Sequence, residues 1–203
     1  MHVEFLVEEP SAEIVLTNIV PRIMGEGISF RIHAHQGKTD LLSKLLPRLR
    51  GYKHWLPEDW RIVVLVDTDD EDCRKLKGQL EERAQEAGLL TKTNRSTGSN
   101  FKVLNRLAIE ELEAWFFGDV EALHATYPRI PLTLARKEKY RDPDAIRGGT
   151  WEALHRELRR IGYYAGGFPK ISIARAVSEN MVPERNHSKS FRVFRHGLLE
   201  LGG

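Results

Sequence analysis

The segment that most constrains the fold is RIVVLVD at residues 61–67, an apolar run that leads directly into the acidic sequence DTDDED at residues 67–72. A short run that is apolar on both faces is typical of a strand in the middle of a parallel sheet. Four aspartates and one glutamate then lie within six residues. Carboxylates this close repel one another, so they must either spread into solvent or surround a positive charge.

Strand and helix patterns alternate along the chain. Further strands are expected at 2–8, 27–35, 89–93 and 101–109. Helices are expected at 10–25, 38–52, 70–88, 150–161, 170–181 and 188–201. Strands that alternate with helices of this length predict an α/β fold, with a mostly parallel central sheet flanked by helices in three layers. The last three helices predict a helical cap at the C-terminal end of the chain.

The net charge of +2 is unevenly distributed over the 203 residues. Residues 1–128 hold 16 Lys and Arg against 21 Asp and Glu, a net charge of −5, whereas residues 129–203 hold 15 against 8, a net charge of +7. We therefore expect an acidic α/β core at 1–128 and a basic, mainly helical extension packed on it at 129–203. An acidic part joined to a basic one suits a protein that binds a cation at one place and a polyanion at another.

The cysteine content and the N-terminal residues favour a cytoplasmic protein. Cys73 is the single cysteine, so no disulfide can form within the chain. The first ten residues have no basic segment and contain three glutamates, unlike a signal peptide. No apolar run approaches the roughly 20 residues that span a bilayer, so we expect no membrane contact.

Acidic residues follow three of the predicted strands. Glu8 and Glu9 follow the first strand, Asp67 and Asp69 end the third, and a group at 110–113 that includes Glu113 follows the last. Because ligands of open parallel sheets bind beyond the carboxyl ends of the strands, we expect these acids to meet in one crevice. Carboxylate oxygens are the ligands that Mg²⁺ prefers, with Mn²⁺ as a substitute. The alternative is a solvated turn in which Asp69 or Asp70 caps the next helix.

These segments resemble a known family. FLVEEPS followed by VVLVDTDDED is similar to the glutamate and Asp-x-Asp signature of the TOPRIM domains in topoisomerases, bacterial primases and OLD-type nucleases. The chain more closely resembles a bacterial family of unknown function classed as TOPRIM-like, through VEEPSAE, HQGKTDLLSKLLPRLRGY, VDTDDEDCRKLK, IEELEAWFFGD and KSFRVFRHGL. The resemblance implies a metal site at Glu8, Asp67, Asp69 and Glu113. TOPRIM domains usually have glycine after the glutamate, so Glu9 is an alternative to Glu8 here.

The chemistry implied is Mg²⁺-assisted phosphodiester cleavage, in DNA repair or phage defence, with an ATPase as a possible partner. Glu8, Asp67 and Asp69 would be catalytic, with Glu8 as metal ligand or general base. Lys170 begins a predicted helix and would contact the scissile phosphate as a point charge. Three further cations would bind a nucleic acid backbone, with DNA favoured over RNA, namely Lys189, Arg192 and Arg195.

Two other functions remain open. One is a non-catalytic interaction or sensor subunit in which the acids bind a cation for structure only. The other is an aspartate phosphohydrolase with an Asp-x-Asp motif, but there Thr or Val normally stands where this chain has Glu71, and the motif follows the first strand. His33 and His35 share one face of a strand, and we expect them to be structural. The oligomeric state is not indicated by the sequence.

Overall fold

The protein was analysed as a computed structural model that describes residues 1–96 and 100–201. Four parallel strands form its sheet in the order β2-β1-β3-β4. They are β1 (His2–Val7), β2 (Ser29–Ala34), β3 (Trp60–Asp67) and β4 (Val103–Ala108). In the central pair, Val7 lies opposite Leu65, so β1 and β3 end side by side. The predicted α/β fold with a parallel sheet is confirmed.

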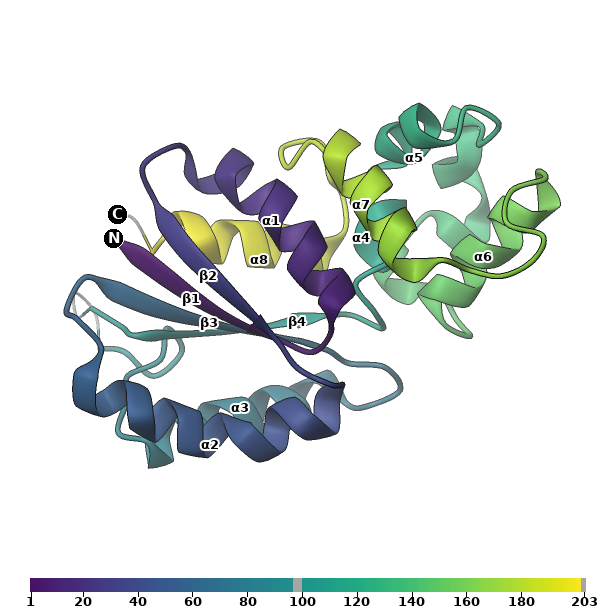
Figure 1. The fold of residues 1–203 in the computed structure, drawn as a ribbon. Coiled ribbons are helices and arrows are strands. Elements are labelled where there is room, and N and C mark those ends of the chain that lie inside the picture. Colours follow the sequence, from purple (N-terminus) through teal and green to yellow (C-terminus); the bar gives the residue numbers. More distant parts are fainter. Residues whose placement is uncertain (97–99, 202–203) are drawn as a thin grey trace.

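Helices cover both faces of the sheet, which gives three layers (Figure 1). One face carries α1 (Pro10–Met24) and α8 (Lys189–Leu199), and the other carries α2 (Lys38–Trp55) and α3 (Cys73–Glu86). Alternate residues of β1 serve the two faces: Phe5 belongs to the core beneath α1 and α8, and Leu6 to the core beneath α2 and α3. This alternation follows from the two-residue period of a strand.

The remaining helices gather beyond the carboxyl ends of the strands (Figure 1). They are α4 (Ala114–Phe117), α5 (Val120–Thr126), α6 (Thr150–Arg160) and α7 (Lys170–Asn180), with short 3₁₀ turns η1 (Leu132–Arg136), η2 (Glu138–Tyr140) and η3 (Pro143–Ala145). The buried apolar residues of this region are continuous with the core beneath α1 and α8. The predicted helical C-terminal region is therefore present, and α8 within it forms part of the three layers.

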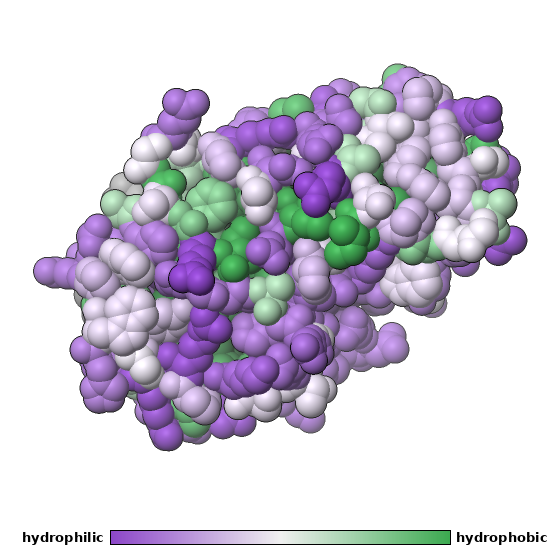
Figure 2. All heavy atoms as spheres, viewed as in Figure 1, coloured by the Kyte–Doolittle hydropathy of each residue, from purple (hydrophilic) through white to green (hydrophobic). Residues whose placement is uncertain are grey.

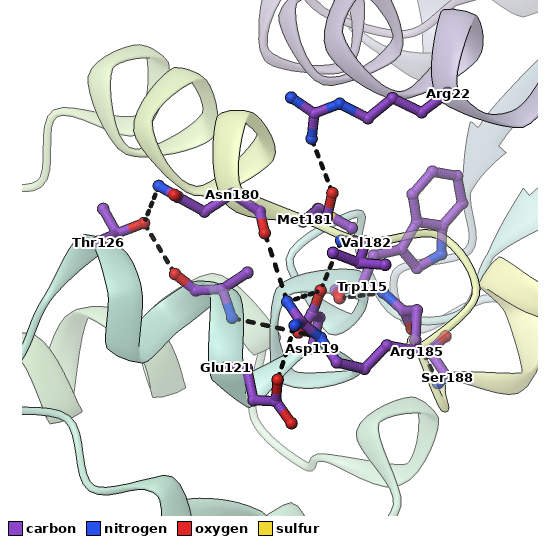
Figure 3. A network of polar contacts seen from close by, with 12 residues as sticks. Arg22, Trp115, Asp119, Glu121, Thr126, Asn180, Met181, Val182, Arg185 and Ser188 are labelled. Atoms are coloured by element: carbon purple, nitrogen blue, oxygen red, sulfur yellow. Dashed lines mark hydrogen bonds and ion pairs between the residues drawn. The ribbon is translucent and has the colours of Figure 1, made fainter. Parts of the chain in front are cut away.

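A buried carboxylate anchors the chain between α7 and α8 (Figure 3). Asp119 accepts hydrogen bonds from the backbone N–H of Val182 at 2.8 Å and of Ala122 at 3.1 Å. The Arg185 guanidinium also donates to both Asp119 oxygens, at 2.7 and 3.0 Å. Because these contacts satisfy the charge of the buried carboxylate, the network has a structural role.

One local expectation was wrong, and one helix ends close to where it was expected. The segment 89–93 makes only an isolated bridge, Thr91 to Val103, because the chain runs in register with β4 for a single residue pair before it turns away. α1 contains Pro21 and continues to Met24, and Gly25 closes the helix by donating to the Pro21 carbonyl at 2.9 Å. Gly25 has a φ of +79°, a conformation that glycine adopts without strain.

Polar side chains cover most of the face shown in Figure 2, and apolar side chains gather near its middle. None of the helices in the described ranges is both long enough and apolar enough to cross a membrane.

Candidate functional site at the carboxyl edge of the sheet

The acids that follow β1, β3 and β4 come together because hydrogen bonds connect the loop after β3 to the loop after β4. The backbone N–H of Asp69 donates to the Glu110 carbonyl at 2.7 Å, and the Glu110 N–H donates to the Thr68 hydroxyl at 2.7 Å. Asp67 is the last residue of β3, and its N–H donates to the Glu8 carboxylate at 3.2 Å. The ends of the central strands therefore hold Glu8 and Asp67 side by side.

Three of these carboxylates are buried or half-buried, and their pKa values are raised. Burial raises the pKa of Asp67 well above its usual range, and the charges of Glu8, Glu113 and Glu9 add to the effect. Burial likewise raises the pKa of Glu8 and that of Glu113 to about 7. Among the described residues, Glu113 Oε2 is buried and has no hydrogen-bond partner. The ionised forms of this group are therefore incompletely compensated.

Lys170 supplies a positive charge to this buried group. It is the first residue of α7, and its Nζ lies 2.6 Å from Glu9 Oε1 and 3.6 Å from Glu113 Oε1. Burial by itself would lower the pKa of Lys170, but the charge of Glu113 and the hydrogen bond to Glu9 raise it above its usual value. Lys170 is therefore a cation held among carboxylates.

Asp69 has a different partner from Asp67. Its φ is +48°, a left-handed conformation that Asp tolerates better than most residues, and its side chain is 51% exposed. Its Oδ2 lies 2.7 Å from Lys38 Nζ, which is also 3.0 Å from the Glu71 carboxylate. Of the two acids of the Asp-x-Asp motif, Asp69 is thus paired with Lys38, whereas Asp67 lies in the buried group beside Glu8. Sequence reasoning missed Lys38, although its place at the start of the helix after β2 puts it at this same edge.

Two neighbouring acids serve as helix caps. Asp72 accepts from the Lys75 N–H at 2.8 Å and caps α3, so the alternative that Asp69 or Asp70 is the cap was wrong. The Glu111 Oε2 atom accepts from the backbone N–H of Thr150 at 2.8 Å and of Trp151 at 2.9 Å, which fixes the start of α6 against the acidic loop. Glu111 was noticed in the sequence only as one of a group of acids, since its partner lies far along the chain.

The cations of α8 are arranged apart from these carboxylates. Lys189 lies 3.9 Å from Asp142, and Arg195 lies 2.7 Å from Glu184. Arg192 is exposed. Among the described residues, no hydrogen bond or ion pair joins these three side chains to the acids that follow β1, β3 and β4.

His33 and His35 have partners within the sheet and, among the described residues, do not join the acids as metal ligands. His33 contacts the Glu4 carboxylate, and His35 Nδ1 lies 2.9 Å from the Val7 carbonyl oxygen. Within residues 1–96 and 100–201, no three His, Cys, Asp or Glu side chains are arranged as a metal-binding group. In the described arrangement, lysine ammonium groups are the positive charges that balance the acidic edge.

Comparison with known proteins places the chain in a family. Comparison with curated proteins and with solved structures gives no significant match. A family model described as a domain of unknown function (DUF4276) matches residues 7–199. The predicted membership of a family of unknown function is confirmed, whereas the relation to TOPRIM nucleases stays a prediction. Because the match covers almost the whole sequence, the chain belongs to the DUF4276 family.

Proposed function

We propose that this protein is a Mg²⁺-dependent nuclease whose reaction takes place at the carboxyl edge of the sheet. The observation that carries the proposal is the buried group formed by Glu8, Asp67 and Glu113, whose pKa values are raised, with the Lys170 ammonium 3.6 Å from Glu113. Perturbed titratable groups of this kind gather at functional sites more often than elsewhere. The resemblance of the strand-end acids to the TOPRIM signature supports the same reaction class.

The donor atoms are of the type that a hard divalent cation prefers, although the described side chains are not gathered around one ion position. They are carboxylate oxygens from Glu8, Glu9, Asp67 and Glu113, and the buried Glu113 Oε2 has no partner among the described residues. These four residues would hold the ion. When bound, Mg²⁺ supplies Lewis-acid polarisation of a phosphate oxygen and lowers the pKa of a bound water.

The side chains of the protein would divide the remaining tasks. Lys170 would contact a non-bridging phosphate oxygen as a point charge, because its ammonium is already held at the site by Glu9 at 2.6 Å. Glu8 would serve as metal ligand or as the base that accepts a proton from water, a role that its raised pKa favours. Asp69, held by Lys38, would add negative charge at the outer side of the site.

The experiment is a cleavage assay on labelled single-stranded DNA, duplex DNA and RNA with Mg²⁺, Mn²⁺ or EDTA. We expect metal-dependent cleavage by the wild type and a loss of at least about a hundredfold in Asp67→Asn. The matched control is Asp72→Asn, which removes one charge from the same acidic run. Asparagine caps a helix as well as aspartate does, so this variant should cleave normally.

Two results would contradict the proposal. One is the absence of metal-dependent cleavage of all three substrates by the wild type. The other is equal cleavage by wild type and Asp67→Asn, which would assign any activity to another site or to a contaminant.

A second candidate is the non-catalytic cation-binding module, and one observation favours it. Lys38 and Lys170 already lie against Asp69, Glu71 and Glu9, so these acids are partly neutralised without a metal. On this view, Mn²⁺ would raise the melting temperature of the wild type but not of Asp67→Asn, and no substrate would be cleaved.

A further inference from the structure

Three neighbouring hollows along α6 share lining residues and are together called the α6 groove here. The outer hollow, of about 550 Å³, is lined in part by Arg147 and Arg156. Arg156 also lines the middle hollow, of about 420 Å³, together with Arg159. Glu152 joins the middle hollow to the inner one, of about 220 Å³, which is lined in part by Asp69. The groove therefore leads from basic residues to the acidic edge of the sheet.

Five cations line the outer and middle hollows; Lys139 and Arg160 are paired with Glu157, whereas the other three have no acidic partner among the described residues. Arg147, Arg156 and Arg159 are exposed, and their side chains make no hydrogen bond or ion pair with any other described residue. By contrast, two of the α8 cations, Lys189 and Arg195, are paired with acids. Unpaired arginines bind phosphate at a smaller cost, because no existing ion pair must be broken.

The inner hollow is physically joined to the candidate site. Its lining includes Glu110 and Glu111 as well as Asp69. Glu111 caps the start of α6, at 2.8 Å from the Thr150 N–H, so α6 has a fixed position relative to the acidic loop. The charge of Glu111 also contributes to the raised pKa of Glu113. A chain of phosphates that lies on the arginines would thus approach the acidic loops that follow β3 and β4, whose residues line the inner end of the groove.

An aromatic group of three side chains reaches the middle hollow through one member, His155. His155 lines this hollow, and its ring lies nearly parallel to that of Trp151, at 14° and 6.2 Å between centroids. The Phe168 ring is 5.1 Å from His155 and 5.4 Å from Trp151. His155 Nε2 is buried and has no partner among the described residues. Aromatic side chains beside a basic groove are typical of proteins that stack unpaired bases.

We propose that the α6 groove binds a single-stranded nucleic acid, with its phosphates on Arg147, Arg156 and Arg159 and a base against the His155 group. Delivery of this strand to the acidic edge rests on the proposed nuclease function, whereas binding itself does not. Duplex DNA would bind less tightly, because its bases are already stacked within the helix and cannot reach the aromatic group. Neither the three arginines nor His155 was singled out from the sequence, since this region shows only an amphipathic pattern with scattered arginines.

The experiment measures binding by fluorescence anisotropy in EDTA, where metal-dependent cleavage cannot proceed. The probes are a labelled oligothymidine of about 15 nucleotides, an oligouridine of the same length and a duplex of mixed sequence. We expect tighter binding of single strands than of duplex, and at least about tenfold weaker binding by the double variant Arg156→Glu/Arg159→Glu. The DNA and RNA arms show which single strand is preferred.

Two variants sharpen the assignment. The matched control Arg50→Glu/Arg83→Glu makes the same charge change at exposed arginines of α2 and α3, and it should bind within about threefold of wild type. His155→Ala should weaken binding of single strands by about fivefold or more and leave duplex binding unchanged. Thermal melts of each variant check that it is folded.

The outcomes separate this inference from the proposed function. Equal binding of single strands and duplex, or equal losses in the α6 variant and the control, would overturn the groove even if the wild type cleaves DNA. So would a larger loss in Arg192→Glu/Arg195→Glu than in the α6 variant. Groove-dependent binding without cleavage would instead support the groove and contradict the nuclease.

Discussion

Glu113, next to the carboxyl edge of the sheet, and Glu157, in α6, are both buried carboxylates, with side chains 1% and 5% exposed. Their pKa values are displaced in opposite directions. Burial raises the pKa of Glu113 to about 7. Burial alone would do the same to Glu157, but hydrogen bonds from Lys139, Tyr140 and Arg160 lower its pKa to about 2. Burial therefore does not decide the charge state, and the partners do.

The number of partners explains the difference. Glu157 accepts from the Tyr140 hydroxyl at 2.8 Å, from Lys139 at 3.0 Å and from Arg160 at 3.1 Å, so both of its oxygens are satisfied. Glu113 has Lys170 at 3.6 Å and a second oxygen without a described partner. A carboxylate that is fully paired stabilises the fold, whereas one that is left incomplete is available to a ligand.

The largest expected effect comes from Glu113→Gln. The folded protein holds the Glu113 proton up to about pH 7, and the unfolded chain releases it near its usual value of 4.5, so stability falls as the pH rises between these values. Glutamine cannot ionise, so the variant should have a free energy of unfolding about 3 kcal/mol higher than that of wild type at pH 8, and an equal one at pH 4. Urea unfolding in EDTA at both pH values measures this. A variant no more stable than wild type at pH 8 would contradict the comparison.

The second largest effect is expected in Glu157→Gln, which should destabilise the fold rather than stabilise it. Because the folded pKa is about 2, the Glu157 charge stabilises the fold above about pH 4.5, and this contribution is lost as the pH falls towards 2. We expect a loss of about 2 kcal/mol at pH 7, a value reduced for solvent screening at the exposed Lys139 and Arg160. The same unfolding experiment at pH 7 and pH 3 should show the difference shrinking. A constant difference would mean that lost packing, rather than charge, is the cause.

The smallest effect compares the two lysines. Lys170→Met leaves Glu9 and Glu113 without their cation and should cost about 1 to 2 kcal/mol at pH 8, and less at pH 5, where Glu113 is protonated. Lys139→Met should cost less than about 1 kcal/mol, because Lys139 is exposed and Glu157 keeps two other cations. Melting curves at both pH values test this. A larger loss in Lys139→Met would break the comparison.

The sequence was sufficient for the sheet and most helices, because these depend on local patterns. The period-two alternation around Phe5 and the apolar run at 62–66 correspond to β1 and β3 of the structure. Segment 89–93 has the same local pattern, but its pairing depends on the distant Val103 and extends over one residue only. Local pattern could not reveal that limit, since strand pairing is a property of the tertiary structure.

Part of the candidate site could also be predicted from local sequence patterns. Strand-end acids such as Glu8 and Asp67 can be located from the sheet rule alone, and the structure brings these two together. Lys38 could have been located by the same rule, from its place at the start of the helix after β2. The α6 cap at Thr150 could not, because it reaches Glu111 from a distant part of the chain. The split between Asp67 and Asp69 depends on one left-handed residue, and the sequence gives no periodic signal for it.

The position of α8 has a consequence for the order in which the chain folds. Phe191 and Phe194 of α8 pack against Trp115, with ring centroids 5.1 and 5.0 Å apart from it, and α8 contacts β4. Until residues 189–199 leave the ribosome, the indole and this face of β4 lack their cover. We therefore expect the sheet to complete its packing only late in synthesis. A nascent chain that stalls before α8 would expose apolar surface that chaperones bind.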